Sequence, residues 1–281
     1  MKFYTALYAC CTLALSSAIG KADEYALKYL YGPADFANNP YPNEITFTGG
    51  TITENGITCT SGQSISASMY QAFPSLATNK TWAVAMTFAA DSLSIGSGFG
   101  NLFHGLFSPE IGETDGKSLN LGYDTTTGAF QSSLNITNQP GPGVASMLEA
   151  LPQGEALTIM INQTGKDTAG VPANAENTIF VTVFSGRTQI GTFEIGKWTG
   201  EYRLHDFTIG DKDGETEFTL QGMGVIVNGS PNEQNGKDFM TEYFDKVNVP
   251  KVPEPSSTLL ALAGSGIFLA RRRRRSSWNK G

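Results

Sequence analysis

Cysteine and histidine are scarce in this chain, and their scarcity excludes several kinds of site. The 281 residues include three cysteines, and Cys10 and Cys11 lie in an apolar N-terminal segment. Cys59, the remaining one, cannot form an intramolecular disulfide or a thiolate metal cluster, so we expect a small buried side chain. The two histidines, His104 and His205, belong to no recognisable catalytic triad. A glycine-rich phosphate loop and a paired-histidine metal motif are also missing.

Basic side chains are scarce in the body of the chain. From Asp23 to Val249 there are 10 Lys and Arg against 25 Asp and Glu, a difference of 10 − 25 = −15, whereas the whole chain carries −7. A body this acidic will not attract nucleic acid or an anionic membrane surface. The charge suits a soluble secreted protein, and acidic loops can also hold calcium.

The N-terminus has the pattern of a secretory signal peptide. Lys2 is followed by an apolar run over residues 3–19, and small residues then offer cleavage sites, of which Ala22 is the one we predict. Residues 1–22 are therefore expected to be removed on export.

The C-terminus carries a second apolar run, which is shorter than a stable membrane span. Residues 256–270 hold no charge and, as a helix of 15 residues, would reach about 22 Å against a hydrocarbon core of about 30 Å. Residues 271–275 are five arginines, which keep that end cytoplasmic and leave the preceding chain outside. We predict a short hydrophobic helix that engages a membrane transiently.

Together these features resemble the PEP-CTERM sorting signal. The residues that carry the resemblance are Pro253, Glu254, Pro255, Arg271, Arg272 and Arg273. The resemblance implies an exosortase-type sorting enzyme as partner and a precursor anchored in the inner membrane of a Gram-negative bacterium. It also implies that the final location is the cell surface or the extracellular space. The predicted organisation is a signal peptide over 1–22, one domain over 23–250, the sorting signal over 251–275 and a polar tail over 276–281.

The body reads as a succession of short strands. Apolar and polar residues alternate over 65–69, 82–88 and 157–162, which predicts half-buried strands with one wet face. Asn-Gly at 55–56 and Ser-Gly at 185–186 favour tight hairpins. Helices are expected only over 144–151 and 237–246. Many strands without intervening helices predict an all-β fold, an antiparallel jelly-roll β-sandwich.

Four segments of the body resemble the concanavalin A-like, laminin-G type sandwich. They are residues 81–88, 179–187, 204–210 and 222–227. The resemblance covers 44–249 and implies a fold that in its relatives binds or cleaves glycans.

The glycan-cleaving relatives of this sandwich carry the order Glu-x-Asp-x-x-Glu on one strand, which aims two carboxylates at one bond about 5 Å apart. The nearest stretch here, residues 110–115, has the wrong order and is flanked by Pro109 and Gly116. We therefore predict a protein that is not an enzyme, while a glycoside hydrolase with carboxylates from distant segments stays the alternative.

The densest acidic cluster is a candidate calcium site. Its carboxylates Asp211, Asp213 and Glu215 alternate around Gly214, as oxygen ligands of calcium do, although the order differs from an EF-hand. The alternative is a solvated hairpin tip.

A sugar site needs an exposed aromatic ring flanked by amides and carboxylates. The candidates on expected loops and strand ends are Tyr123, Trp198 and Tyr202 with Asn120, Asp124 and Asn138. Trp82 lies on an alternating apolar face and is expected in the core.

Three functions are compatible with these features of the sequence. The first is an exported, non-catalytic surface or matrix protein that binds extracellular polysaccharide, and it is the one we predict. The others are a glycoside hydrolase on the same fold and a purely structural coat protein.

Overall fold

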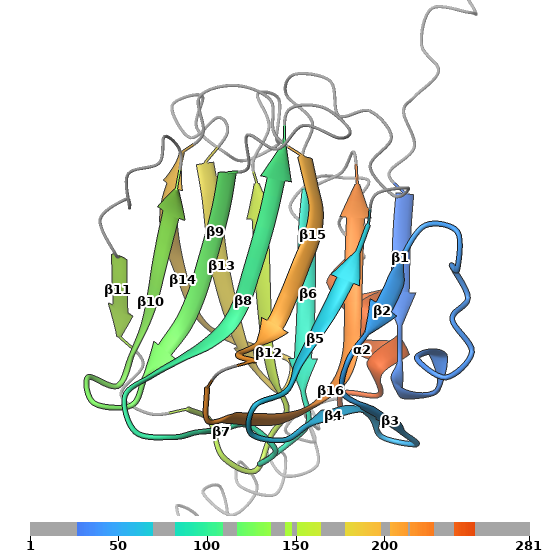
Figure 1. Cartoon of the computed structure of the whole chain (residues 1–281), viewed down its shortest axis with the longest axis horizontal. Helices are drawn as coiled ribbons and strands as arrows, with labels where there is room; N and C mark the ends of the chain where they lie inside the picture. The colour runs from blue at the N-terminus through green and yellow to red at the C-terminus, as the bar shows by residue number, and fades with distance from the viewer. Residues whose placement is uncertain are drawn as a thin grey trace, which may run out of the picture. The chain divides into compact units, whose positions relative to one another are not determined.

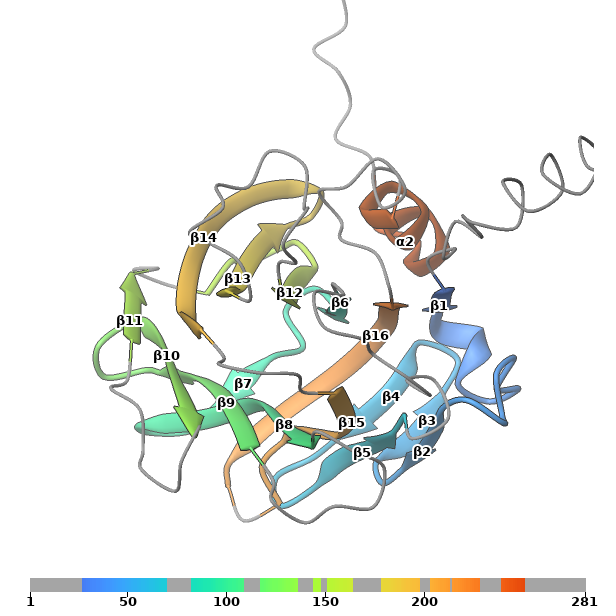
Figure 2. The same cartoon turned by 90° about the horizontal axis from the view of Figure 1, so that it is seen from above.

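The structure is a computed structural model that describes residues 27–69, 82–108, 117–135, 144–147, 151–163, 178–197, 203–212, 214–227 and 239–250. These residues form two antiparallel sheets, here named sheet A and sheet B, that face each other across a common core. Figure 1 shows sheet B in front of sheet A, and Figure 2 shows both sheets from above.

Sheet A is built around β16, the longest strand. Its order is β14 (Thr188–Lys197), β13 (Thr178–Ser185), β12 (Leu157–Gln163), β6 (Trp82–Phe88), β16 (Thr216–Val227), β4 (Gly56–Cys59) and β3 (Thr51–Thr53). Two further strands pair with β16, namely β1 (Leu27–Tyr31) and β7 (Ser94–Ile95).

Sheet B has seven strands. Its order is β11 (Val144–Met147), β10 (Ala129–Asn135), β9 (Lys117–Asp124), β8 (Phe99–Ser108), β15 (Arg203–Gly210), β5 (Ser64–Ser68) and β2 (Thr46–Thr48). A short 3₁₀ helix, η1 (Pro33–Asp35), and the helix α2 (Phe239–Val247) complete the elements. The two-sheet arrangement confirms the predicted antiparallel β-sandwich.

The core lies between the sheets and is rich in aromatic rings. Phe130 of sheet B meets Phe193 of sheet A with ring centroids 6.2 Å apart. Trp82 is fully buried, and its indole N–H donates to the side-chain oxygen of Gln163 at 2.9 Å, so its one polar atom is satisfied. Both the predicted core position of Trp82 and that of Cys59, which is 1% exposed, are confirmed.

At β6 and β12 the outer face of sheet A is not wet, so the prediction of one wet face is wrong for these two strands. Residues 65–69, in contrast, alternate between buried and accessible positions as predicted. Every residue of β6 and β12 is buried on both faces. The helix α2 provides part of the cover: it packs outside β16 and β1 (Figure 2), reaches β6 through Tyr243, and forms a second apolar cluster there. The cluster joins Ala83, Ala85 and Ile226 of the sheet to Phe239 and Tyr243 of the helix.

Small residues let α2 lie close to the sheet. Gly224 of β16 faces the helix, and a Cβ there would come within 2.7 Å of Cδ2 of Tyr243. A Cβ on Gly222 would overlap Val247 and lie 2.8 Å from the carbonyl oxygen of Tyr31. Alanines 83 and 85 continue this shallow floor. The glycines and alanines are therefore a docking surface for the helix.

A buried chain of hydroxyls fixes the helix laterally. The Tyr243 hydroxyl donates to the carbonyl of Gly222 at 3.1 Å and lies 2.7 Å from the Thr87 hydroxyl, which in turn lies 2.8 Å from that of Thr158. Because Tyr243 uses its single proton on Gly222, Thr87 donates to Tyr243 and Thr158 donates to Thr87. Burial raises the pKa of the Tyr243 phenol well above its usual value.

Ion pairs tie α2 to three separate parts of the sandwich. Lys28 of β1 pairs with Glu242 at 2.6 Å, and Lys246 pairs with Asp35 of η1 at 2.8 Å. Arg187, at the β13–β14 turn, pairs with Asp245 at 2.7 Å and also donates from Nε to the carbonyl of Val249 at 2.8 Å.

Other local predictions have mixed outcomes. Both hairpins are confirmed, with turns at 54–55 and 186–187, each shifted by one residue from the predicted dipeptide. The helix predicted over 237–246 is confirmed as α2, whereas the one predicted over 144–151 is wrong. Residues 144–147 pair with β10 as β11, since a strand edge supplies hydrogen bonds that a short isolated helix cannot match. The predicted C-terminal hydrophobic helix lies outside the described residues.

Candidate functional site

The outer face of sheet B carries a continuous polar row across six strands. Most inward positions of these strands are apolar, for example Leu119, Leu121, Phe207 and Ile65. Since paired residues of neighbouring strands project to the same face, the pairing registers align their polar partners in one row. The row runs Ser133, Asn120, His104, Thr208, Ser66 and Thr48. Each of these side chains is half-buried or exposed.

An exposed aromatic ring lies at one end of this face. Phe99, the first residue of β8, pairs with Asp124 and is 48% exposed. Its ring covers Gly122 of β9, where a Cβ would overlap the ring. In the register, Gly122 lies between Asn101 and Gln131, so the ring is bordered by two amides and a carboxylate. We name Phe99, Asn101, Asp124 and Gln131 the Phe99 platform.

Hydrogen bonds made by Thr125 hold the segment before Phe99 in place. The Thr125 hydroxyl accepts from the N–H of Gly98 at 3.0 Å and lies 3.2 Å from the carbonyl of Gly96, to which it donates. The Thr125 N–H donates to the carbonyl of Gly98 at 3.0 Å. Gly98 has φ +95°, a conformation that glycine adopts without strain. The turn after β9 therefore positions the aromatic ring before any ligand arrives.

The carboxylate of the Phe99 platform is also ordered. Asp124 accepts from the backbone N–H of Thr126 at 2.8 Å and from the Gln131 amide at 2.9 Å. The Thr126 N–H, the largest contribution, lowers the pKa of Asp124 below its usual value. The carboxylate therefore stays ionised at neutral pH and can accept hydrogen bonds from the hydroxyl groups of a ligand.

His104 lies in the middle of the polar row. Its pairing partners are Asn120 on β9 and Thr208 on β15. Partial burial lowers the pKa of the imidazole, so it is neutral at pH 7 and offers one donor and one acceptor. The face can therefore make neutral hydrogen bonds along its length.

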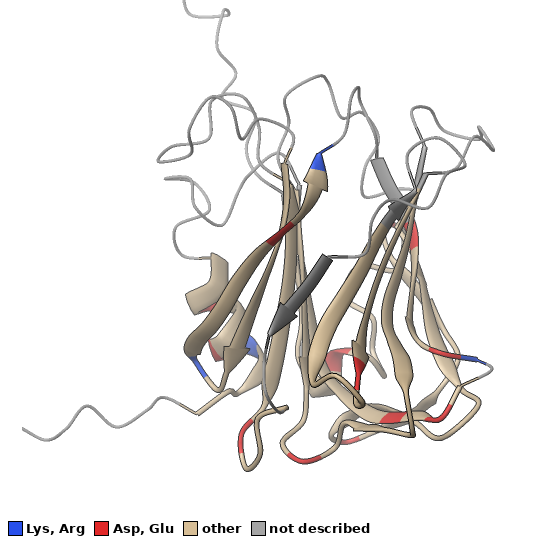
Figure 3. Ribbon diagram, turned by 90° about the vertical axis from the view of Figure 1, so that its left-hand side faces the viewer, with Lys and Arg blue, Asp and Glu red and all other residues tan. Residues whose placement is uncertain are grey.

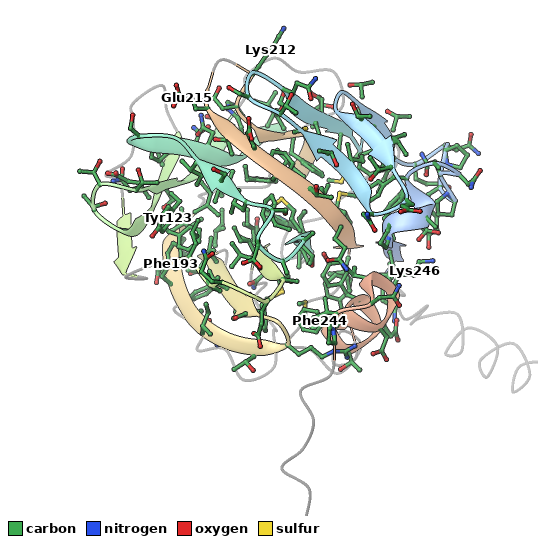
Figure 4. All side chains as sticks on the ribbon, turned by 90° about the horizontal axis from the view of Figure 1, so that it is seen from below. Tyr123, Phe193, Lys212, Glu215, Phe244 and Lys246 are labelled. Atoms are coloured by element: carbon green, nitrogen blue, oxygen red, sulfur yellow. The ribbon has the colours of Figure 1, made fainter. Side chains whose placement is uncertain are left out.

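The predicted sugar-site residues separate in the structure. Asn120 lies in the polar row, where its amide donates to Ser133 at 3.3 Å, and Asp124 belongs to the Phe99 platform. Tyr123 is 4% exposed and packs its ring edge-on against Phe130 at 5.3 Å, among the inward side chains of Figure 4. Because alternation turns Tyr123 inward, its ring is not an accessible surface. Trp198, Tyr202 and Asn138 lie outside the described residues.

Sequence reasoning missed Phe99, although a signal was present. Glycines flank it on both sides at 98 and 100, and a third, Gly122, lies on the neighbouring strand. Glycine opposite an aromatic residue leaves room for the ring to lie flat on the sheet. Only the β8–β9 register shows which glycine that is.

The predicted calcium ligands do not form a metal site among the residues that the structure describes. Asp211 lies 3.5 Å from the Asn101 amide, whereas the Glu215 side chain covers Gly96. Asp213 lies outside the described residues, and the described ones contain no group of three His, Cys, Asp or Glu side chains that could hold a metal ion. The stretch is not a hairpin tip either, because it joins β15 of sheet B to β16 of sheet A (Figure 4 labels Lys212 and Glu215). Calcium at this connection stays a prediction.

The acidic stretch 110–115, the nearest match to the catalytic motif, lies outside the described residues. His205 falls at an irregularity in the β15–β8 pairing, and its side chain is not among those described.

Acidic residues dominate the charge of the described surface. Figure 3 shows Asp and Glu along the connections at the lower end of the view, with few Lys and Arg. This distribution agrees with the excess of acidic residues counted from the sequence and gives the molecule a negative field.

Comparison with known protein families identifies a sorting motif near the C-terminus. The PEP-CTERM protein-sorting motif matches residues 251–275, the range predicted from the sequence, and marks the chain as an exported protein. A search of curated protein sequences finds no match. Within the described residues, no helix combines the length and apolar character needed to cross a membrane.

Solved structures similar to this chain include lectin domains and parts of glycan-cleaving enzymes. Peanut lectin has 12% identity and a TM-score of 0.43, covering 72% of this chain and 97% of its own. The exoplasmic domain of VIP36, bound to Ca²⁺ and Man3GlcNAc, has 12% identity and a TM-score of 0.41, covering 66% and 85%. Domain 4 of a Geobacillus stearothermophilus arabinanase, with arabinotriose, has 14% identity and a TM-score of 0.42, covering 76% and 98%. Since these scores are below 0.5, the fold assignment rests on the strand order and registers described above.

Proposed function

We propose that this exported protein is a non-catalytic sandwich that binds extracellular polysaccharide through the outer face of sheet B. The observation that carries the proposal is the Phe99 platform, an exposed ring fixed on the sheet and bordered by amides and an ionised carboxylate. A sugar ring presents an apolar C–H face for stacking and hydroxyls around its rim, which this arrangement matches.

The charge of the molecule narrows the ligand to neutral glycans. The body carries −15, and Asp124 lies beside the ring. A polysaccharide rich in uronate or sulfate would be repelled by this field, whereas a neutral one is not. The polar row continues from the platform across neighbouring strands about 4.8 Å apart, so a chain of several sugars can lie on it.

The sorting motif provides the route to the outside. In this proposal an exosortase-type enzyme processes the chain at residues 251–275 while the precursor is anchored in the inner membrane of a Gram-negative bacterium. The sandwich then reaches the cell surface or the matrix. Calcium at 211–215 is a further proposal that a chelator tests separately.

The proposal is tested with the exported protein on arrays of neutral and uronate-rich glycans, followed by titration of the best neutral oligosaccharide. Phe99→Ala should weaken binding about tenfold or more, the loss of roughly 1.4 kcal/mol expected for truncating an aromatic contact. Ile52→Ala is the matched control, because Ile52 is a 52% exposed apolar residue on sheet A.

Three outcomes would overturn parts of this picture. Absence of binding with and without calcium leaves the structural coat protein as the explanation. Equal binding by the Phe99→Ala and control proteins removes the Phe99 platform as the site. Release of new reducing ends from a bound glycan establishes the glycoside hydrolase instead.

A further inference from the structure

A second exposed apolar side chain lies on the outer face of sheet B. Leu106 of β8 is 38% exposed. Its neighbour Gly105 pairs with Leu119 and Phe207, which point into the core, so alternation turns Leu106 outward. A single exposed leucine is ordinary on a protein surface. This one is informative because it shares a strand and a face with Phe99.

Phe99 and Leu106 lie at the two ends of one line along β8. This strand is the central one of sheet B, with three strands on either side, and Figure 1 shows it running from the lower to the upper end of the sheet. The β9 partners of the two residues, Asp124 and Ser118, are six positions apart, which corresponds to about 20 Å along the strand. In the described part of the chain, the other large apolar side chains that are exposed belong to β3 and β14 of sheet A.

The positions between these two ends offer hydrogen bonds. On β8 they are Asn101 and His104, both half-buried. His104 is flanked by Asn120 on β9 and Thr208 on β15, which are also half-buried. The outer face of β8 thus has apolar ends and a polar middle. We name its four side chains the β8 strip: Phe99, Asn101, His104 and Leu106.

We infer that a neutral oligosaccharide lies lengthwise on the β8 strip, with one sugar stacked on Phe99 and a distant one packed against Leu106. This inference rests on the proposed function and gives it a direction. An extended sugar chain presents apolar C–H faces together with hydroxyls, which match apolar contacts at the ends and hydrogen-bonding groups between them. The path across the strands offers only small hydroxyls beyond Thr208, namely Ser66 and Thr48.

Carboxylates at both ends of the β8 strip favour a neutral sugar over other partners. Asp124 pairs with Phe99, and Asp206 pairs with Leu106. An anionic glycan would meet like charge at each end, in addition to the acidic field of the body. A protein partner that covered the strip with apolar side chains would bury both carboxylates, which costs free energy unless cations accompany it. Sugar hydroxyls instead donate hydrogen bonds to such groups.

The experiment measures how affinity depends on the length of the glycan. The probes are neutral gluco-, manno- and galacto-oligosaccharides, each from the disaccharide to the hexasaccharide. The exported natural protein is compared with Phe99→Ala, Leu106→Ala and Ser66→Ala by titration calorimetry. Ser66→Ala is the matched control, because Ser66 is exposed on the same face but lies on the path across the strands. Thermal unfolding verifies that each variant is folded.

The lengthwise path predicts a different length dependence for each variant. Phe99→Ala should weaken binding of every length about tenfold. Leu106→Ala should leave the disaccharide unchanged, because it is too short to reach from Phe99 to Leu106. The same variant should weaken the hexasaccharide about threefold to tenfold, the effect of removing an apolar contact that is partly exposed in the free protein. Ser66→Ala should bind every length like the natural protein.

Contrary results separate this inference from the proposed function. Weaker hexasaccharide binding by Ser66→Ala, with natural affinity in Leu106→Ala, overturns the lengthwise path and leaves glycan binding intact. So does an affinity of the natural protein that is the same for all lengths. A change of sedimentation mass in Leu106→Ala with unchanged glycan affinity makes Leu106 a contact between copies of the chain and also overturns the inference. No binding of any probe by the natural protein overturns both.

Discussion

The outer faces of the two sheets have the same strand geometry, but the part of sheet A around β6 and β16 is covered, whereas the outer face of sheet B is open. On sheet A, glycines and alanines form a shallow floor on which α2 packs, and the residues of β6 and β12 are buried. On sheet B, serine, threonine, asparagine and histidine project from the corresponding positions, and the side chains stay accessible. Alternation therefore shows which residues share a face, whereas a covering element decides whether that face meets water.

The largest expected difference concerns a buried ring under the helix. Tyr243→Ala removes a fully buried side chain and its hydrogen bonds to Thr87 and Gly222, so unfolding free energy should fall by about 3–5 kcal/mol. Denaturant unfolding measures this loss. Thr48→Ala, on the open face of sheet B, should change the free energy by less than about 0.5 kcal/mol. Similar losses for both variants would contradict the contrast between the faces.

A smaller effect is expected from a single added methyl group. Gly224→Ala forces a Cβ to within 2.7 Å of Tyr243 and should cost about 1–3 kcal/mol through overpacking. Gly191→Ala on the edge strand β14 is the control, since nothing lies within 4 Å of the added Cβ. That variant should be neutral or slightly stabilising, because alanine restricts the unfolded chain. Thermal unfolding of the pair separates close packing from a general intolerance of alanine in strands.

The smallest effect concerns the open face and its response to pH. Burial lowers the pKa of His104 in the folded protein, so the unfolded chain binds the proton more tightly. This penalty is absent above the ordinary histidine value of about 6.5 and grows as the pH falls toward the folded pKa. His104→Gln should therefore remove part of the stability loss between pH 7.5 and pH 5. Parallel pH profiles for the natural and variant proteins would show that His104 does not contribute.

The burial of aromatic residues could be predicted from the sequence in α2 but not in sheet B. Phe239 and Tyr243 lie four residues apart in the segment predicted as a helix, a spacing that places them on one helix face, and both are buried in the structure. Tyr123 and Phe99 could not be sorted in the same way, because each is flanked by glycine and each lies near a strand end. The face on which each side chain lies depends on the β8–β9 register, which places Tyr123 inward and Phe99 outward. Long-range pairing of this kind leaves no local signal in the sequence.

The sequence by itself determined the export signal, the acidic charge of the body and the antiparallel β-sandwich, since each follows from composition or from a period of two to four residues. Only the tertiary structure decided that α2 covers one sheet, that residues 144–147 pair as a strand, and that Phe99 lies exposed beside Asp124. The physical reason is that burial and strand partners depend on contacts between segments far apart in the chain, whereas periodicity reports only on neighbours.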